Sequence, residues 1–205
     1  MGDYFHFDPS AVPVRGEGPL LEELGLAEGG ALHVEIGFGK DVRILREAER
    51  DPAGTYLGVE ISRKKAASFC RKVARAGLRN VRAFNGDARK LLAEMLPPGS
   101  VSSFTILFPD PWPKRRHWKH RWIQADTAAL LARALGPGAL IIAATDHDDY
   151  AAQIEAELKG AGLEMGERRG EIPAEDRSLF AQRFERLGRD AAKLLAAGQS
   201  PPSAE

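Results

Sequence analysis

Short apolar runs alternate along the chain with longer segments in which apolar residues recur every three or four positions. The first pair is an apolar run at Ala31–Gly39, which ends in a glycine turn, followed by an amphipathic segment at Val42–Arg50. The second pair is Thr55–Ile61 followed by Ser62–Gly77. Short apolar runs favour buried strands, and apolar residues at helical spacing favour amphipathic helices. The pattern therefore predicts repeated strand–helix units from residue 31 onward.

The alternation continues through the middle of the chain. The further expected elements are a third strand in Asn80–Ala88, a fourth in Val101–Trp112, a helix at Ile123–Leu135, a fifth strand at Gly138–Asp146 and a helix near Tyr150–Gly160. Pro109 breaks the fourth strand, because proline has no N–H to donate. In the second helix, Ser62 suits the N-cap and Gly77 the C-terminal stop. The segment after Gly188 fits either a helix or a final edge strand.

Strands that alternate with helices are typical of an α/β fold with a parallel sheet and helices on both faces. Ligands of such sheets bind beyond the carboxyl ends of the strands. We therefore expect the functional residues near those ends. We also expect one domain over residues 1–198 and a disordered tail at residues 199–205.

Length and composition fit one soluble globular domain, with 205 residues, 43% hydrophobic and 28% charged. The single cysteine, Cys70, excludes an internal disulfide and fits a reducing compartment. No secretory signal opens the sequence, and no apolar stretch approaches the ~18–20 residues of a membrane span. The expected location is the cytoplasm.

The formal net charge of zero results from cancellation between regions of opposite sign. Ser62–Lys90 carries ten Lys/Arg and one acid, and Trp112–Trp122 carries five Lys/Arg and no acid. Met1–Glu35 has seven acids and one base, and Asp146–Asp176 has ten acids and three bases. A segregated basic surface attracts a polyanion whatever the total charge. The alternative for the basic helix is a solvated face without a partner.

Acids and glycines occupy the ends of the first three predicted strands. Glu35 precedes a turn that contains Gly37 and Gly39, Glu60 ends the second strand, and Asp87 follows the third. Glycine permits tight turns and close approach of a ligand to the backbone. These ends therefore form a candidate cofactor site.

A dinucleotide fits this turn poorly. Its fingerprint requires a third glycine where Val42 stands, and Glu35 would repel a diphosphate. Glu60 could instead accept from both ribose hydroxyls, and Asp87 from the exocyclic amine of adenine. The set favours S-adenosylmethionine, which has two cationic groups, over a nicotinamide cofactor. Alternatively, Glu35 and Asp87 are helix caps or turn formers, which suits Asp87 better.

Asp110 lies between Pro109 and Pro111, at the end of the fourth predicted strand. Both prolines restrict the backbone, so we expect a stiff, extended segment. The two carboxylate oxygens could accept from N1–H and the N2 amine of guanine, and no other common base offers two adjacent donors there. Trp112 could stack on the base, which is worth ~1–3 kcal/mol. The segment predicts a guanine-binding site.

A basic run follows. Its cations suit phosphate contacts, and they are Lys114, Arg115, Arg116, Lys119 and Arg121. Trp118 and Trp122 add flat surfaces, and we expect Trp122, beside the next helix, to be structural. His117 and His120 lack a set of Cys and His partners, so no metal site is predicted.

The end of the fifth strand carries a further acidic group. Asp146 stands where a second substrate contact would lie. Asp148 and Asp149 could simply start the next helix at its positive end.

Four stretches resemble a known family, and they are VEIGFGKD, GVEI, NGDA and FPDPWPKRRHWKHR. Together they resemble the tRNA guanine-N7 methyltransferases, over about Leu32 to Gly188. The FPDPWPK block is highly specific, whereas the glycine turn alone is not. The resemblance implies a Rossmann-like class I methyltransferase fold, with a mostly parallel twisted sheet of about seven strands, the last antiparallel, and helices on both faces. It also implies S-adenosylmethionine as cofactor and methylation of guanine 46 in the tRNA variable loop.

The resemblance assigns roles to individual residues. The implied cofactor-binding set is Glu35, Gly37, Gly39, Glu60, Asp87, Ala88 and Asp110. Asp110 also matches the proposed catalytic acid of the family, and Lys114 and Asp146 match its substrate-binding positions. The expected substrate-binding set is Trp112, Lys114, Arg115, Arg116, Lys119, Asp146, Ser178 and Phe180.

The C-terminal signature of the family is only partly present. Ser178 keeps the hydroxyl of the signature and Phe180 keeps its ring. Leu179 and Ala181 stand where the family has a lysine and a substrate-binding glutamate, and Glu185 lies four residues after Ala181.

We therefore expect a cytoplasmic, S-adenosylmethionine-dependent tRNA (guanine(46)-N7)-methyltransferase. It would bind tRNA as a monomer or homodimer, without a metal and without a membrane. Two alternatives stay open. A small-molecule methyltransferase on the same fold leaves the cations beside Trp112 unexplained, and an RNA-binding homologue with impaired catalysis is favoured by Leu179 and Ala181.

Overall fold

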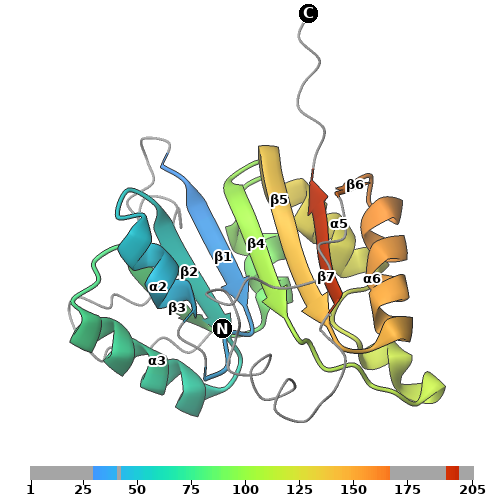
Figure 1. The fold of residues 1–205 in the computed structure, drawn as a ribbon, viewed down its shortest axis with the longest axis horizontal. Coiled ribbons are helices and arrows are strands. Elements are labelled where there is room, and N and C mark those ends of the chain that lie inside the picture. Colours follow the sequence, from blue (N-terminus) through green and yellow to red (C-terminus); the bar gives the residue numbers. More distant parts are fainter. Residues whose placement is uncertain (1–29, 41–42, 167–192, 199–205) are drawn as a thin grey trace, which may run out of the picture.

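The computed structural model describes residues 30–40, 43–166 and 193–198, which form a seven-stranded sheet flanked by helices (Figure 1). The strands are β1 (Leu32–Ile36), β2 (Thr55–Glu60), β3 (Val81–Asn85), β4 (Val101–Leu107), β5 (Leu135–Thr145), β6 (Glu164–Met165) and β7 (Lys193–Gly198). The helices are α2 (Arg43–Arg50), α3 (Arg63–Ala76), α4 (Ala88–Lys90), the π-helical turn η1 (Leu91–Met95), the 3₁₀ helix η2 (Arg115–His120), α5 (Ala125–Ala134) and α6 (Asp148–Gly160).

The strand order is β3-β2-β1-β4-β5-β7-β6. Strands β1 to β5 pair in parallel, and β7 runs antiparallel to both β5 and β6. The carboxyl ends of the five parallel strands therefore lie at the same end of the sheet, the lower end in Figure 1. The predicted Rossmann-like α/β fold is confirmed, including its antiparallel last strand.

The segment after Gly188 contains a strand at its described residues, but that strand does not lie at the edge. β7 pairs with β5 on one side and with the two-residue strand β6 on the other. The alternative of a final edge strand is therefore wrong in position. Pairing decides the neighbours of a strand, and its own sequence pattern carries no information about them.

The junction between α5 and β5 also differs from the prediction. The helix ends at Ala134, and Leu135 already pairs with Val101 of β4. The next pair in the ladder joins Ser103 to Leu140, so β5 contains extra residues between the two pairs. Gly138 lies in this bulge at φ 72°. The bulge lets β5 begin directly after the helix, earlier than its apolar pattern indicates.

The helices pack on both faces of the sheet around two hydrophobic clusters. One cluster joins α2 and α3 to the sheet, and its largest members are Phe38, Tyr56 and Phe69. The other joins η1, α5 and α6 to the sheet, with Phe104 and Tyr150 among its fully buried residues. The alternation of side chains along each strand supplies both faces.

Both predicted ends of α3 are in place. Gly77 caps the C-terminus in the left-handed conformation, at φ 66°, and its N–H donates to Ala74 O. Ser62 occupies the N-cap position with an extended backbone, but its hydroxyl makes no capping hydrogen bond. The first turn of α3 contains no acidic residue either, so the positive end of this helix dipole lacks its usual side-chain partners.

Candidate functional site

The ends of β1, β2 and β3 are joined by hydrogen bonds around Glu60. This carboxylate is 5% exposed, and its oxygens accept from Ser62 N at 2.8 Å and Gly39 N at 3.1 Å. Lys65 Nζ lies 3.7 Å from the same group. Asn85 donates its side-chain amide to Glu60 O at 2.7 Å. Glu60 is therefore held in one orientation at the mouth of the sheet, as a cofactor-binding carboxylate requires.

The glycine turn lies directly beside Glu60. Gly37 and Gly39 have φ of 77° and 61°, a conformation that favours glycine. Phe38 points back into the core, where its ring packs 4.2 Å from the ring of Phe69. A Cβ added at Gly58 of β2 would lie 2.8 Å from Phe38 Cδ1, so this contact requires a glycine there. Gly37 and Gly39 thus present backbone and no side chain to a ligand.

Glu35 and Asp87, the other acids at the ends of the first three strands, differ in burial. Glu35 is 4% exposed, and its carboxylate lies 4.0 Å from the guanidinium of Arg43 in α2. Asp87 is exposed and caps α4, because its Oδ1 accepts from Arg89 N at 2.9 Å. The helix-cap alternative therefore holds for Asp87, and this role does not test its contact with a ligand. Ala88, the first residue of α4, is buried.

Sequence reasoning missed Ile61, which follows Glu60 and is 75% exposed. Its carbonyl is held by Asn85 Nδ2 at 3.2 Å. An exposed branched apolar side chain beside a buried carboxylate is suited to cover the face of a flat ring. The only signal in the sequence was an apolar last residue in the expected strand Thr55–Ile61, directly after Glu60.

The second part of the site follows β4. Phe108 N donates to Ala144 O at 2.8 Å, which fixes the end of β4 to β5. Phe108 and Trp112 have φ of 51° and 43°, a region that costs non-glycine residues of the order of 1 kcal/mol or more. Between them, Asp110 is exposed. The segment is therefore restricted as predicted, but two left-handed residues bend it at both ends, so it is not simply extended.

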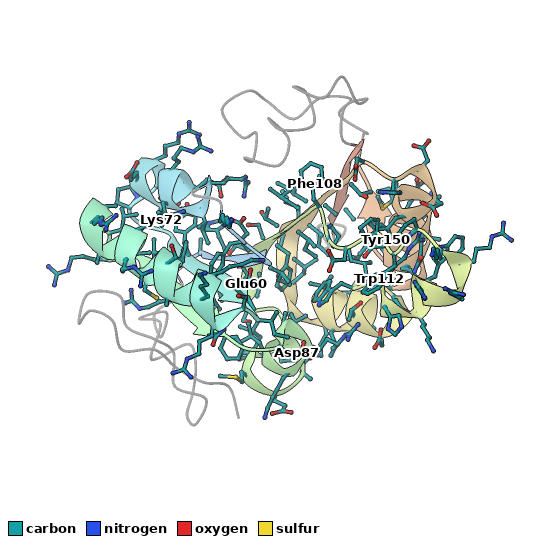
Figure 2. The ribbon with its side chains drawn as sticks, turned by 90° about the horizontal axis from the view of Figure 1, so that it is seen from below. Glu60, Lys72, Asp87, Phe108, Trp112 and Tyr150 are labelled. Atoms are coloured by element: carbon teal, nitrogen blue, oxygen red, sulfur yellow. The ribbon has the colours of Figure 1, made fainter. Side chains whose placement is uncertain are left out.

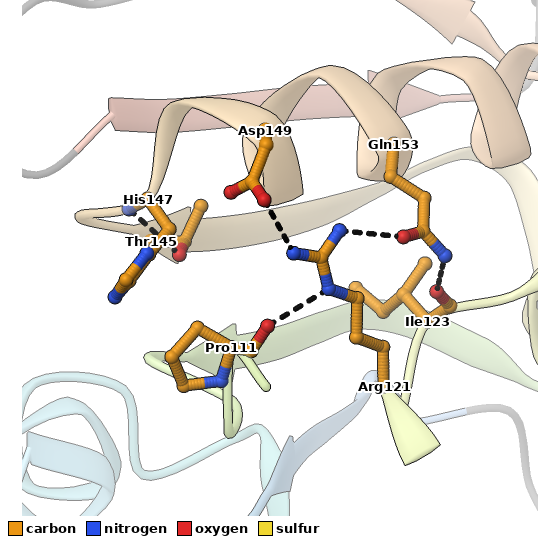
Figure 3. A network of polar contacts seen from close by, with 7 residues as sticks. All are labelled: Pro111, Arg121, Ile123, Thr145, His147, Asp149 and Gln153. Carbon is orange, nitrogen blue, oxygen red and sulfur yellow. Dashed lines mark hydrogen bonds and ion pairs between the residues drawn. The ribbon is translucent and has the colours of Figure 1, made fainter. Parts of the chain in front are cut away.

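Arg121 corrects a prediction. We expected it to contact phosphate, but its side chain is 0% exposed. Figure 3 shows its guanidinium between two elements: Nε donates to Pro111 O at 2.8 Å, while the other nitrogens donate to Asp149 at 2.8 Å and Gln153 at 2.8 Å. The ring of Tyr150 lies 4.7 Å from the guanidinium carbon. Arg121 thus ties the segment around Asp110 to the start of α6, and has no donor facing solvent.

The charges around Arg121 affect its neighbours. Burial alone would raise the pKa of Asp149, but the hydrogen bond and charge of Arg121 bring that pKa below its usual value. Burial raises the pKa of the Tyr150 hydroxyl. Hydrogen bonds from Ile123 and Trp122 and the charge of Arg121 lower that pKa, and the charge of Asp110 raises it. Asp110 therefore lies close enough to this network to influence it electrostatically.

The remaining cations of the basic run are all exposed, and they are Lys114, Arg115, Arg116 and Lys119. They lie on or next to η2, where a polyanion could reach them. Trp112 is 37% exposed, and its ring lies 5.8 Å from His117 and 5.2 Å from His120. These rings support one side of the indole and leave part of it accessible for the predicted stacking.

The other predicted residues have mixed outcomes. Trp122 packs against the core, as expected. The guanidinium carbon of Arg121 lies 4.3 Å from the Trp118 ring, so that ring is covered from one side. Asp146 is half-buried just after β5. Ser178 and Phe180 lie outside the described residues.

In the described ranges, no three His, Cys, Asp or Glu side chains gather as a metal site would require. Over the same residues, no helix combines the length and apolar character needed to cross a membrane.

Viewed from the carboxyl ends of the strands, the two parts of the site lie on either side of the middle of the sheet (Figure 2). Glu60 lies toward α3, whereas Trp112 and Tyr150 lie toward α5 and α6. The pairing of Ile36 in β1 with Ile106 in β4 brings the two parts into register. The arrangement can hold a cofactor beside an exposed carboxylate and a cationic surface.

Comparisons with known proteins show which family the chain resembles over most of its length. A family model described as "Putative methyltransferase" matches residues 30–194. A tRNA (guanine-N(7)-)-methyltransferase of Nitrosococcus oceani is 38% identical over 84% of this chain and 74% of that protein. One of Azorhizobium caulinodans is 48% identical over 58% of this chain, and the match spans about half of that protein, 51%.

Solved structures show the same fold at low identity. A 16S rRNA methyltransferase has a TM-score of 0.66 at 16% identity, covering 89% of this chain and 93% of that one. A 16S rRNA (adenine(1408)-N(1))-methyltransferase from Catenulisporales acidiphilia, described with its cosubstrate SAM, has a TM-score of 0.63 at 18% identity, covering 93% and 95%. With the family match and the relatives above, the chain belongs to the tRNA (guanine-N7-)-methyltransferase family.

Proposed function

We propose that the protein transfers a methyl group from S-adenosylmethionine to N7 of a guanine in tRNA. The finer assignment is guanine 46 of the variable loop. The observation that carries the proposal is the exposed Asp110, which lies between β4 and the cationic 3₁₀ helix η2, at the same end of the sheet as the buried carboxylate of Glu60.

The residues of the first three strand ends fit the cofactor. Glu60 would accept from the ribose hydroxyls, since each carboxylate oxygen has a second lone pair beyond its backbone contact. Gly37 and Gly39 would let the amino acid portion approach the backbone, with the charge of Glu35 nearby. Ile61 would cover the adenine face, and Asp87 would accept from its amine. When bound, S-adenosylmethionine supplies a methyl on cationic sulfur, and transfer forms the C–N7 bond, breaks the C–S bond and moves no proton.

Asp110 has two tasks in this reaction. Its two oxygens would accept from N1–H and the N2 amine of the guanine, which orients the base. The carboxylate would also offset the positive charge that N7 methylation leaves on the base. No general base is needed, because N7 has a free lone pair at neutral pH. The chain therefore contributes mainly alignment and charge.

The segment that carries Asp110 is held by a hydrogen bond at each end. Phe108 N–H bonded to Ala144 O fixes one end of the segment, and Arg121 bonded to Pro111 O fixes the other. A carboxylate on a segment held at both ends loses little freedom when it binds a base. The exposed cations of η2 would then neutralise nearby phosphates.

The test is methyl transfer to unmodified tRNA, followed by strand cleavage at 7-methylguanine. We expect cleavage at position 46 in wild type, none in a tRNA with adenine at that position, and at least a ~100-fold lower rate in Asp110→Asn, with cofactor affinity measured separately. Methylation at another guanine would refute the position. A wild-type rate in Asp110→Asn with normal cofactor binding would refute the role of Asp110.

Two other results would favour the alternatives. If the protein bound tRNA but neither bound nor used S-adenosylmethionine, it would be an RNA-binding homologue without catalysis. If it bound the cofactor and had no affinity for tRNA, a small-molecule methyltransferase would be favoured.

A further inference from the structure

A cavity of about 390 Å³ lies between the glycine turn and α3, and it borders the cofactor part of the site at Gly39, Ser62 and Lys65. Its lining residues are Gly39, Lys40, Ser62, Lys64, Lys65, Ser68, Phe69 and Lys72. We call it the lysine cavity. Four of its eight lining residues are lysines, and none is acidic. They come from two elements, the turn after β1 and the first three turns of α3. If the basic face of α3 were only solvated, its lysines would not need to line a cavity together with Lys40 of a separate turn.

The charges of the lysine cavity are poorly balanced by the protein itself. Among the described residues, Glu60 is the one carboxylate within ion-pair distance of a lysine of this set, 3.7 Å from Lys65. That carboxylate already accepts two backbone N–H groups. Lys72 Nζ donates to Lys40 O at 2.7 Å, which draws the two elements together. The cavity therefore has a net positive charge that an anion could neutralise.

The start of α3 adds to the positive potential. Ser62 lines the cavity with a hydroxyl that makes no capping bond, and no acid occupies the first turn of the helix. The N–H groups of such a turn and its dipole favour an anion. Lysine binds phosphate as a point charge with three donors. Lysine ammonium groups, a hydroxyl and a helix start are together suited to phosphate.

We propose that the lysine cavity binds the sugar–phosphate backbone of the tRNA at a second place, apart from the basic run of η2. Lys65 and Lys72 are seven residues apart, about 10 Å along a helix, so the lysines together can contact more than one phosphate of a strand. Phe69 is 2% exposed and packs on Phe38, so the cavity offers no ring for stacking on a base. Binding there would position the RNA without reading its sequence.

The location fits such a role. In Figure 2, Lys72 lies beyond Glu60 toward α3, on the left of the view, whereas Trp112 lies on the right, toward α5 and α6. A tRNA that presents its guanine near Asp110 would thus have backbone contacts on both sides of the reacting base. This inference rests on the proposed function, because it assumes that tRNA is the substrate.

The experiment measures tRNA affinity over a range of KCl concentrations for wild type and Lys64→Gln/Lys72→Gln. The double variant removes two charges and keeps Lys65, which contacts Glu60. We expect its Kd for tRNA to rise about tenfold at low salt, with a slope of log K against log salt that is shallower by about 1.5. The Kd for S-adenosylmethionine and the rate at saturating tRNA should stay within about twofold.

Arg75→Gln/Arg79→Gln is the matched control, because both arginines are exposed and lie outside the cavity, one near the end of α3 and one beyond it. It removes the same charge and should change the salt slope by much less. Equal slopes in the two double variants would overturn the inference, as would weaker cofactor binding with unchanged tRNA affinity. Failure of the proposed function is distinct, since wild type itself would then not methylate tRNA.

Discussion

The two parts of the site are held in different ways. At the ends of β1 to β3, the carboxylate of Glu60 is fixed by backbone N–H groups from the adjoining turns. After β4, the segment that carries Asp110 is fixed by a buried side chain, Arg121, which reaches it from η2's far end. The backbone N–H donors to Glu60 are in place once the turns have formed. The buried cation of Arg121 instead requires side-chain partners, which are Asp149 and Gln153.

Substitutions in the two parts of the site should therefore have different effects. A change at Glu60 should affect cofactor binding and leave the fold largely intact, because its partners are local turns. A change at Arg121 should affect stability and the placement of Asp110 together, because Arg121 joins elements that are distant in sequence.

The largest effect should come from Arg121→Met. The substitution keeps an apolar stem but leaves Pro111 O and Gln153 without their donor, so we expect a loss of about 2–4 kcal/mol in the free energy of unfolding. Urea denaturation measures it. Arg115→Met, on the exposed side of η2, should cost less than about 0.5 kcal/mol and weaken tRNA binding instead. Similar stability losses in the two variants would contradict the buried role of Arg121.

Glu60→Gln should have the next largest effect. An amide would place N–H groups against the N–H of Gly39 or Ser62, so we expect cofactor affinity to fall about 30-fold or more, about 2 kcal/mol. Isothermal titration calorimetry with S-adenosylmethionine measures this, and tRNA affinity should stay unchanged. Glu94→Gln, on the exposed surface of η1, is the control. Wild-type cofactor affinity in Glu60→Gln would remove Glu60 from the site.

Gly39→Ala tests whether the turn after β1 contributes to cofactor binding, with Gly77→Ala as the control. Gly39 and Gly77 have similar positive φ, 61° and 66°, and neither has a heavy atom close to an added Cβ. Both alanine variants should lose about 1 kcal/mol of stability from backbone strain. Only Gly39→Ala should also weaken cofactor binding. If both variants lowered cofactor affinity equally, the effect would be general destabilisation.

The smallest effect concerns pH. The folded-state pKa of Asp149 lies below its usual value, so its contribution is present above the unfolded pKa of about 3.9 and is lost as the pH falls toward the lower folded value. Because Asp149 is 41% exposed, we expect Asp149→Asn to lower Tm by only about 1–3 °C at pH 7 and to have no effect at the lowest pH. Thermal melts from pH 7 to 2.5 measure this. An equal change at all pH values would show that charge is not the cause.

Most of the fold could be predicted because it depends on local patterns. The parallel strands and the helices between them follow from alternating apolar spacing, and Gly77 ended its helix as expected. The position of β7 between β5 and β6 could not be predicted. It depends on pairing between residues about fifty apart in the chain, such as Ile142 and Ala196, and no pattern within either strand specifies that partner.

The positions of site residues were predictable where they follow directly from the end of a strand. Glu60 and the glycines of the turn lie where the sequence placed them. Arg121 was mistaken for a phosphate contact, because it belongs to a run of cations and its partners, Asp149 and Gln153, follow 28 and 32 residues later. The positive φ of Phe108 was equally hidden, since nothing in its residue type signals that conformation.

The contact between Phe38 and Gly58 limits how this fold could be redesigned. Phe38 occupies the space that any side chain at Gly58 would need, and a Cβ there would also lie 3.3 Å from Phe69 Cζ. A second strand grafted from another parallel-sheet protein must therefore keep a glycine two residues before its terminal acid. A chimaera with a β-branched residue at that position would need a smaller residue than phenylalanine in the turn, or the turn would be displaced.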